Sequence, residues 1–197
     1  MAKRRLPNPD NQIAENYAQY RADLDSDKTI TGILDVSSVK KNQYNFYSGE
    51  CSVSAAKPFG NTSIECKIKR SDEYHYTLTY CSDAIKSRLL TRLDAGIGTH
   101  YNRAPGIPQH LTSVPMPHYH EYRSDGYDVA YRIPGVDYSD ESSTKFDYEE
   151  GFLYFSDKLH IKDPSGGEVR IDCRPLSVPS KDIEIDNDPN NNVDFPE

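Results

Sequence analysis

Tryptophan is absent from this chain of 197 residues, and no long run of apolar residues occurs in it. Because a helix needs about 18 consecutive apolar residues to cross a bilayer, the sequence predicts no membrane-spanning segment. The basic residues at the N-terminus are not followed by an apolar stretch, which argues against a secretory signal. The sequence therefore predicts a cytoplasmic protein that has no membrane partner.

Cysteine is scarce, and its four positions contain no Cys-x-x-Cys pair. This spacing argues against a zinc ribbon and against a dithiol redox motif. In a chain without a secretory signal, Cys51, Cys66, Cys81 and Cys173 are expected to be reduced thiols. No cofactor is predicted for the chain.

Hydrophobic residues make up only 36% of the chain, and much of the apolar bulk comes from 15 tyrosines, against 6 phenylalanines. Tyrosine in this quantity favours strands and half-buried surfaces. The net charge is −8, and residues 179–197 are acidic and rich in Asn and Pro, which predicts a disordered tail. Residues 1–9 are predicted to form a flexible basic arm, and residues 10–178 a single domain.

The order of polar and apolar residues predicts an α+β fold. Apolar residues recur at helical spacing behind Asp10, a helix-capping residue, so a helix is expected over 11–25. The segment 95–117 is predicted to be a loop, and 146–160 fits either a helix or a strand. We expect a curved antiparallel sheet with one or two packed helices. Alternation of polar and apolar residues predicts its strands at 62–70, 74–80, 88–94, 118–122, 127–133 and 168–173.

Four of the six histidines lie within one short stretch of the chain, from His100 to His120. His118 and His120 are two residues apart on a predicted strand, so both side chains point to the same face as Tyr122. The pair can act as general acid and base, because imidazole titrates near neutral pH. It can instead bind a metal with a third ligand from His100 or Asp94, or serve only as half-buried structural histidines.

Arginines accompany the histidines. Arg92, Arg103 and Arg123 lie close to them in sequence, and a guanidinium group suits the charge and shape of a phosphate. Alternatively, these arginines pair with neighbouring aspartates. Histidines and arginines without a strong carboxylate cluster resemble a metal-independent ribonuclease site more than a two-metal nuclease.

Three short segments carry a family resemblance. They are Leu-Leu-Thr-Arg-Leu-Asp at 89–94, Thr-His-Tyr-Asn at 99–102 and Pro-His-Tyr-His-Glu-Tyr-Arg at 117–123. In order and spacing they resemble the central pattern of an uncharacterised family of small proteins from Gram-positive bacteria and their mobile elements. More loosely, they are similar to TumE-type toxins of toxin–antitoxin pairs. The resemblance implies matching positions without assigning roles to them: Asp94, His100, Asn102, His118 and His120.

Three functional hypotheses follow. The first is a toxin-like accessory protein of a phage or mobile element that acts on RNA or nucleotides, with a host or antitoxin protein and RNA as partners. The second is a non-catalytic anti-defence inhibitor, similar to anti-CRISPR proteins, which binds a host complex through tyrosine-rich strands and the acidic tail. The third is a metal-binding module built on His118 and His120.

The first hypothesis assigns roles to particular residues. His118 and His120 do acid–base work, His100 and Asn102 orient the substrate, and the arginines offset phosphate charge. The candidate catalytic residues are therefore His118, His120, His100 and Asp94, and the candidate substrate-binding residues are Arg92, Asn102, Arg103, Arg123 and Tyr122.

Overall fold

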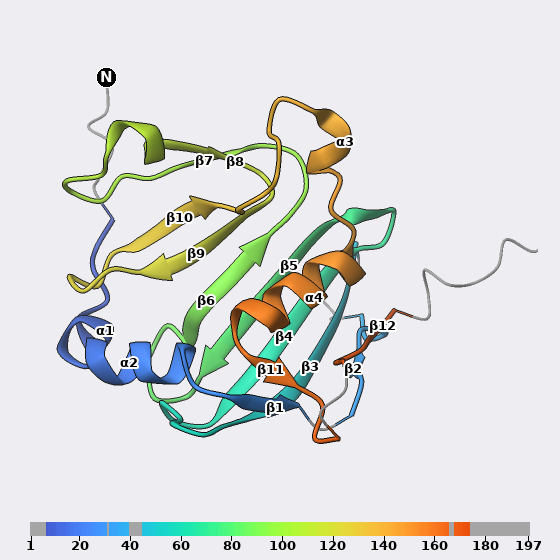
Figure 1. The fold of residues 1–197 in the computed structure, drawn as a ribbon, viewed down its shortest axis with the longest axis horizontal. Coiled ribbons are helices and arrows are strands. Elements are labelled where there is room, and N and C mark those ends of the chain that lie inside the picture. The colour runs from blue at the N-terminus through green and yellow to red at the C-terminus, as the bar shows by residue number, and fades with distance from the viewer. Residues whose placement is uncertain (1–6, 31, 40–44, 166–167, 174–197) are drawn as a thin grey trace, which may run out of the picture.

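The structure is a computed structural model, and it describes residues 7–30, 32–39, 45–165 and 168–173. Within these residues the fold is α+β, with one eight-stranded sheet, two small two-stranded sheets and helices (Figure 1). The strand order of the large sheet is β10-β9-β6-β5-β4-β3-β1-β11. All its neighbouring strands are antiparallel except β1 and β11, which pair in parallel at one edge.

The bounds of the elements are as follows. The large sheet consists of β1 (Lys28–Ile30), β3 (Phe46–Ala55), β4 (Thr62–Lys69), β5 (Asp72–Ser82), β6 (Leu89–Asp94), β9 (His118–Tyr122), β10 (Asp128–Arg132) and β11 (Ile161–Lys162). The small sheets pair β2 (Leu34–Asp35) with β12 (Ile171–Asp172) and β7 (Thr99–Tyr101) with β8 (Ser113–Pro115). The helices are α1 (Asn11–Glu15), α2 (Tyr17–Leu24), α3 (Glu141–Thr144), α4 (Tyr148–Lys158) and a 3-10 turn at Gln109–Leu111.

The predicted α+β class is confirmed, and several elements differ in detail. The expected helix over 11–25 is two helices that meet at Asn16, whose side-chain amide donates to the carbonyl oxygen of Gln12. The expected loop 95–117 contains β7, β8 and the 3-10 turn. The segment 146–160 is helical over α4, and the strand expected at 168–173 is only two residues long.

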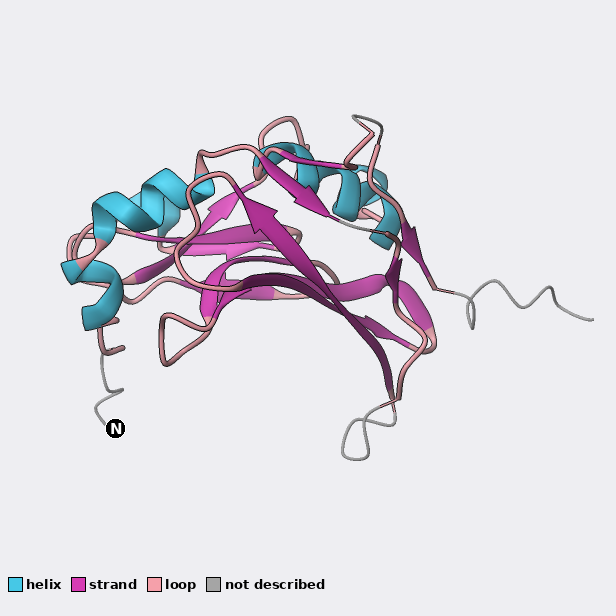
Figure 2. Ribbon diagram, turned by 90° about the horizontal axis from the view of Figure 1, so that it is seen from below, coloured by secondary structure: helices cyan, strands magenta, loops and turns pink. Residues whose placement is uncertain are grey.

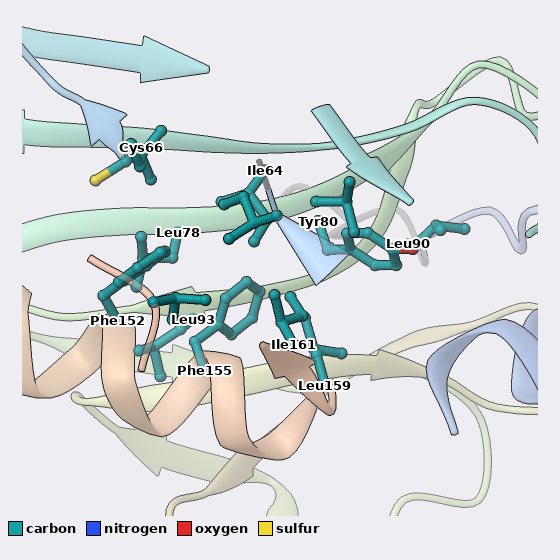
Figure 3. Close-up of a cluster of buried hydrophobic side chains, with 14 of the residues drawn as sticks. Ile64, Cys66, Leu78, Tyr80, Leu90, Leu93, Phe152, Phe155, Leu159 and Ile161 are labelled. Atoms are coloured by element: carbon teal, nitrogen blue, oxygen red, sulfur yellow. The ribbon is translucent and has the colours of Figure 1, made fainter. Parts of the chain in front are cut away.

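The hydrophobic core lies between the large sheet and α4 (Figure 3). Alternate residues of β4 are buried, as its period-two pattern predicts. On α4, Phe152 and Phe155 occupy positions three apart, so both side chains face the sheet. The side chain of Asp147 caps this helix by accepting hydrogen bonds from the backbone N–H groups of Glu149 and Glu150, each at 2.9 Å.

The two faces of the sheet are covered differently. Figure 2 shows the two longest helices, α2 and α4, on one side of the sheet, and Leu93 of β6 packs beside Phe155 of α4 on that side (Figure 3). Because successive side chains of a strand point to opposite faces, Arg92 and Asp94 lie on the other side. There, the β7–β8 hairpin covers β9 and β10, and it creates the environment of the histidines.

The remaining predictions concern the ends of the chain and the cysteines. The four cysteines are free, and all but Cys51 are buried, which agrees with reduced thiols. No helix within the described residues is long and apolar enough to cross a membrane. The predicted tail, 179–197, and residues 1–6 of the predicted basic arm lie outside the described residues.

Candidate functional site

The register of three neighbouring strands assembles one half of the site. Arg92 and Asp94 of β6 lie opposite His120 and His118 of β9. Beyond β9, strand β10 pairs antiparallel, and Asp128 lies diagonally across from His120. All five side chains share the face opposite α4, because they occupy alternate positions in their strands. A row of imidazoles flanked by carboxylates results.

His100 comes to this row from a different segment of the chain. It is the central residue of β7, and its ring centroid lies 4.8 Å from that of His120 and 5.5 Å from that of His118. The rings of His118 and His120 are 5.0 Å apart. The three imidazoles therefore form one compact group, which we call the histidine cluster: His100, His118 and His120.

Asn102 holds the hairpin in this position. Its side-chain amide donates to the carbonyl oxygens of Leu111 and Ala130, at 2.7 and 2.8 Å, and accepts from the backbone N–H of Ala130 at 2.8 Å. Both ends of the amide are thus engaged inside the protein, and the residue is 6% exposed. Asn102 positions His100 against β10, which differs from the substrate-orienting role expected from sequence.

In both buried histidines, His118 and His120, the Nδ1 atom has a hydrogen-bond acceptor. The Nδ1 of His118 lies 3.2 Å from the carbonyl oxygen of Pro115, and the Nδ1 of His120 lies 3.0 Å from a carboxylate oxygen of Asp128. A carbonyl or carboxylate oxygen can only accept, so each Nδ1 carries the hydrogen. The Nε2 atoms of both rings face Asp94, at 3.6 Å from His118 and 3.3 Å from His120.

Asp94 is the ionised centre of the group. Burial alone would raise its pKa, but the imidazoles of His118 and His120 and the charge of Arg92 together lower the pKa below its usual range. The Nε atom of Arg92 donates to Asp94 at 2.8 Å, and its Nη2 atom lies 3.2 Å from the Nε2 of His120. Asp94 is consequently a carboxylate at neutral pH.

The histidines differ in their protonation. Burial, together with the neighbouring rings of His120 and His118, lowers the pKa of His100 to about 4, so this imidazole is neutral at pH 7. Burial also disfavours charge on His120, but hydrogen bonds to Asp128 and Asp94 outweigh it and raise the pKa of that ring. A neutral imidazole is therefore in contact with one that binds a proton more tightly.

A cleft of about 690 Å³ opens beside the cluster. His100 and Asp128 belong both to the cleft wall and to the histidine environment, whereas His118 and His120 are 1% and 0% exposed and lie behind them. Clefts of this size hold ligands as large as a nucleotide. The wall is completed by residues from distant parts of the chain: Pro7, Asn8, Pro9, Asp10, Ser87, Thr99, Tyr101, Arg103 and Tyr122.

The structure brings together most of the residues singled out from sequence. Asp94, Arg92 and the histidine cluster are in mutual contact, and Arg103 and Tyr122 line the adjoining cleft. Arg123 lies apart from the cluster: its guanidinium donates to the carbonyl oxygen of Pro105 at 2.8 Å and pairs with Asp125. Arg123 therefore fastens the loop that connects β7 to β8.

Two groups that contact the imidazoles were not among the predicted site residues. Asp128 lies on the predicted strand 127–133, and the register of an antiparallel hairpin with the predicted strand 118–122 would have placed it near His120. The Pro115 carbonyl could not have been found, because a main-chain group leaves no signal in the sequence. The same holds for Pro7–Asp10, which reach the cleft only through tertiary packing.

A scan against protein-family models found no match, and searches of curated proteins and of solved structures found none either. The resemblance to the small-protein family and to TumE-type toxins stays a prediction. Function must be argued from the geometry of the site.

Proposed function

We propose that the protein is a toxin-like enzyme of a phage or mobile element that acts on RNA or nucleotides in the cleft beside His100. The observation that carries this proposal is the convergence of three imidazoles, from β7 and β9, of which His100 lines the wall of a cleft of about 690 Å³. Such a cleft with a few convergent polar groups is the usual form of a small-molecule site.

Among the described residues of the cleft wall, one arginine is free to bind an anionic substrate. Its wall contains two carboxylates, but Asp10 caps α1 and also accepts from the hydroxyl of Ser87, while Asp128 accepts from His120. Arg103 forms no ion pair within the described part of the chain, so its guanidinium remains available for a phosphate. The substrate is therefore held by Arg103, with its phosphate directed toward His100.

The chemistry then takes place at the edge of the histidine cluster. His100 is the imidazole that reaches the cleft, so the attacking oxygen is activated there. Arg92 stands beside Asp94 and His120, where its positive charge offsets negative charge that develops on the substrate. Each of these groups lies on a strand of a sheet, which keeps the geometry rigid.

Two single variants test the proposal. His100→Ala should reduce turnover of RNA or nucleotide substrates by a factor of about 100 or more, because acid–base or equivalent activation contributes roughly that much. Arg103→Ala should instead raise KM and leave kcat within a few-fold, because it removes phosphate binding. Purified variants are assayed on RNA oligonucleotides and nucleotides for new termini and released phosphate.

Arg170→Ala is the matched control, because Arg170 is exposed and lies on the far side of the sheet, beside β12. Expression of the wild-type chain should also arrest growth, and His100→Ala should relieve the arrest. Activity that survives His100→Ala would refute the assignment of the site. Binding to a host protein without any turnover would instead support the anti-defence inhibitor.

A further inference from the structure

We infer that the histidine cluster, completed by Asp94, is a binding site for a divalent first-row transition ion, with zinc as its best occupant. The inference concerns the same side chains as the proposed function and deepens it, but ion binding can be measured without any substrate. It takes up the third hypothesis from the sequence, a metal-binding module built on His118 and His120, in place of the metal-independent site of the first.

A buried ring nitrogen of His118 has no hydrogen-bond partner in the described ranges of the chain. His118 is 1% exposed, its Nδ1 hydrogen is directed to the Pro115 carbonyl, and its buried Nε2 has no hydrogen-bond partner. The nearest charged atom is a carboxylate oxygen of Asp94 at 3.6 Å, which is also an acceptor. Two lone pairs that face each other in a buried site are unfavourable unless a proton or a metal cation lies between them, and a metal ion can fill this place.

The distances between the candidate ligand atoms are close to those around a bound zinc ion. The oxygen of Asp94 lies 3.3 Å from the Nε2 of His120 and 3.6 Å from that of His118. Ligands bound to a tetrahedral zinc at about 2.0–2.1 Å stand about 3.3–3.4 Å from one another. One donor atom of His100 completes the set, since the ring nitrogens of the three histidines lie within 4.8 Å of one another. Binding would require His100 to move toward the other ligands to close the shell.

The groups that surround the two buried histidines are also those found around metal-binding histidines. Histidines that bind metals donate their second ring N–H to a carboxylate or a backbone carbonyl, which fixes the tautomer. His120 has the carboxylate of Asp128 in that place, and His118 has the carbonyl of Pro115. With the hydrogen on Nδ1, each Nε2 can offer a lone pair to an ion, although the Nε2 of His120 then has to give up its contact with Arg92 at 3.2 Å.

The net charge of the site is consistent with the binding of a divalent ion. Asp94 and Asp128 supply two negative charges and Arg92 one positive charge, which leaves the site with one net negative charge. A divalent ion would reverse this to one net positive charge beside the cleft, which favours the phosphate of the proposed substrate. Imidazole with a single carboxylate suits zinc better than magnesium or calcium, which prefer oxygen ligands.

The experiment uses the full chain without a polyhistidine tag, stripped of metal with a chelator and titrated with Zn²⁺ and with Co²⁺ by calorimetry and visible spectroscopy. We expect one equivalent to bind, and the Co²⁺ spectrum to show low coordination without thiolate charge-transfer bands. That spectrum separates the histidine cluster from the cysteines as the source of binding.

The main variant is His100→Ala, because His100 is only partly buried and its loss leaves the strands intact. It should weaken Zn²⁺ binding by a factor of about 100, and Asp128→Asn, which alters an outer-shell partner, by a factor of about 10. His110→Ala, at an exposed histidine, is the control and should leave the affinity unchanged.

Each outcome decides the inference. A folded wild-type chain that binds no stoichiometric ion, or an affinity that His100→Ala leaves unchanged and which thus reflects an adventitious ion only, overturns it. Turnover of RNA or nucleotides by a chain that binds no stoichiometric ion would refute the metal centre and keep the proposed function. Stoichiometric binding without any such turnover would keep the metal centre and refute the proposed function.

Discussion

At the scale of single residues, burial divides the candidate site into groups that meet the substrate and groups that support them. His118 and His120 are the most recognisable feature of the sequence, yet their side chains are 1% and 0% exposed. His100, half-buried, is the one that reaches the cleft. Replacing both buried histidines by alanine would remove the histidine partners of Asp94 and Asp128 and open a buried gap, so a loss of function could not be separated from a loss of fold.

Asn102 gives a prediction at the same scale. Asn102→Ala should lower the free energy of unfolding by about 3 kcal/mol, because the backbone groups of Leu111 and Ala130 would lose buried partners. Asn102→Asp should cost a similar amount, since a carboxylate cannot donate to the two carbonyl oxygens. Urea denaturation measures both variants. Asn11→Ala, at an exposed asparagine, is the control, and equal stability of all three variants would contradict the positioning role.

The sequence predicted which imidazoles belong to the site, but it did not predict their burial or the groups that they contact. Two histidines at alternate strand positions must share a face, so their proximity followed from the pattern alone. The burial of this face was not predictable, because the β7–β8 hairpin that covers it lies in a segment rich in Gly and Pro with no strand pattern. The second ring partners, Asp128 and the Pro115 carbonyl, depend on that same hairpin and turn.

At the scale of the elements, α4 shows how packing overrides intrinsic preference. Gly151 lies in the middle of this helix, where alanine would ordinarily be more stable by about 1 kcal/mol. A methyl group there would overlap the phenol ring and hydroxyl oxygen of Tyr76 on β5. The glycine therefore allows the helix to approach the sheet closely.

The prediction is that Gly151→Ala destabilises the protein by about 1–3 kcal/mol despite the better helix propensity of alanine. Tyr76→Phe is the companion variant, because the buried hydroxyl of Tyr76 has no hydrogen-bond partner among the described residues. Its removal should therefore be nearly neutral. Thermal unfolding monitored by circular dichroism compares the two, and a stabilised Gly151→Ala chain would show that α4 is not packed against Tyr76.

Elements with regular patterns were predictable, and short elements at the edges were not. The alternation in β4 and β5 locates both strands and the turn between them, because one face is buried and the other is not. β1, β2 and β11 have only two or three residues, too few for any period to show. The parallel pairing of β1 with β11 joins distant segments, so only the assembled sheet reveals it.

At the scale of the whole molecule, the abundance of tyrosine should govern behaviour at high pH. Burial raises the pKa of Tyr119 and Tyr122 to about 12, and it also raises the pKa of Tyr20, Tyr76 and Tyr80. In the unfolded chain a tyrosine loses its proton near pH ~10. Below that pH both states are protonated and stability is complete; above it, only the unfolded state releases protons, so stability falls.

We therefore expect the urea midpoint to hold up to about pH 10 and to fall steadily as pH rises from there to about 12. Tyrosinate absorbance measured in parallel should show buried phenols that ionise only as the chain unfolds. Ionisation of all tyrosines near pH ~10 in a chain whose circular dichroism stays native would contradict this account.

The architecture explains why the site lies where it does. The two longest helices, α2 and α4, lie on one face of the sheet and pack with its strands to form the core (Figure 2), while β6, β9 and β10 present polar side chains on the other face. A single hairpin then covers those side chains and brings a third imidazole. The rigid sheet holds the groups in place, and the cleft gives a ligand access to His100.

The most direct test of this account is a crystal structure of the full chain grown with one equivalent of Zn²⁺, with anomalous scattering recorded on both sides of the zinc absorption edge. The account predicts one strong anomalous peak among His100, His118, His120 and Asp94, at bond lengths of about 2.0–2.2 Å. Imidazoles that do not converge, or a zinc peak elsewhere with none at this position, would contradict it.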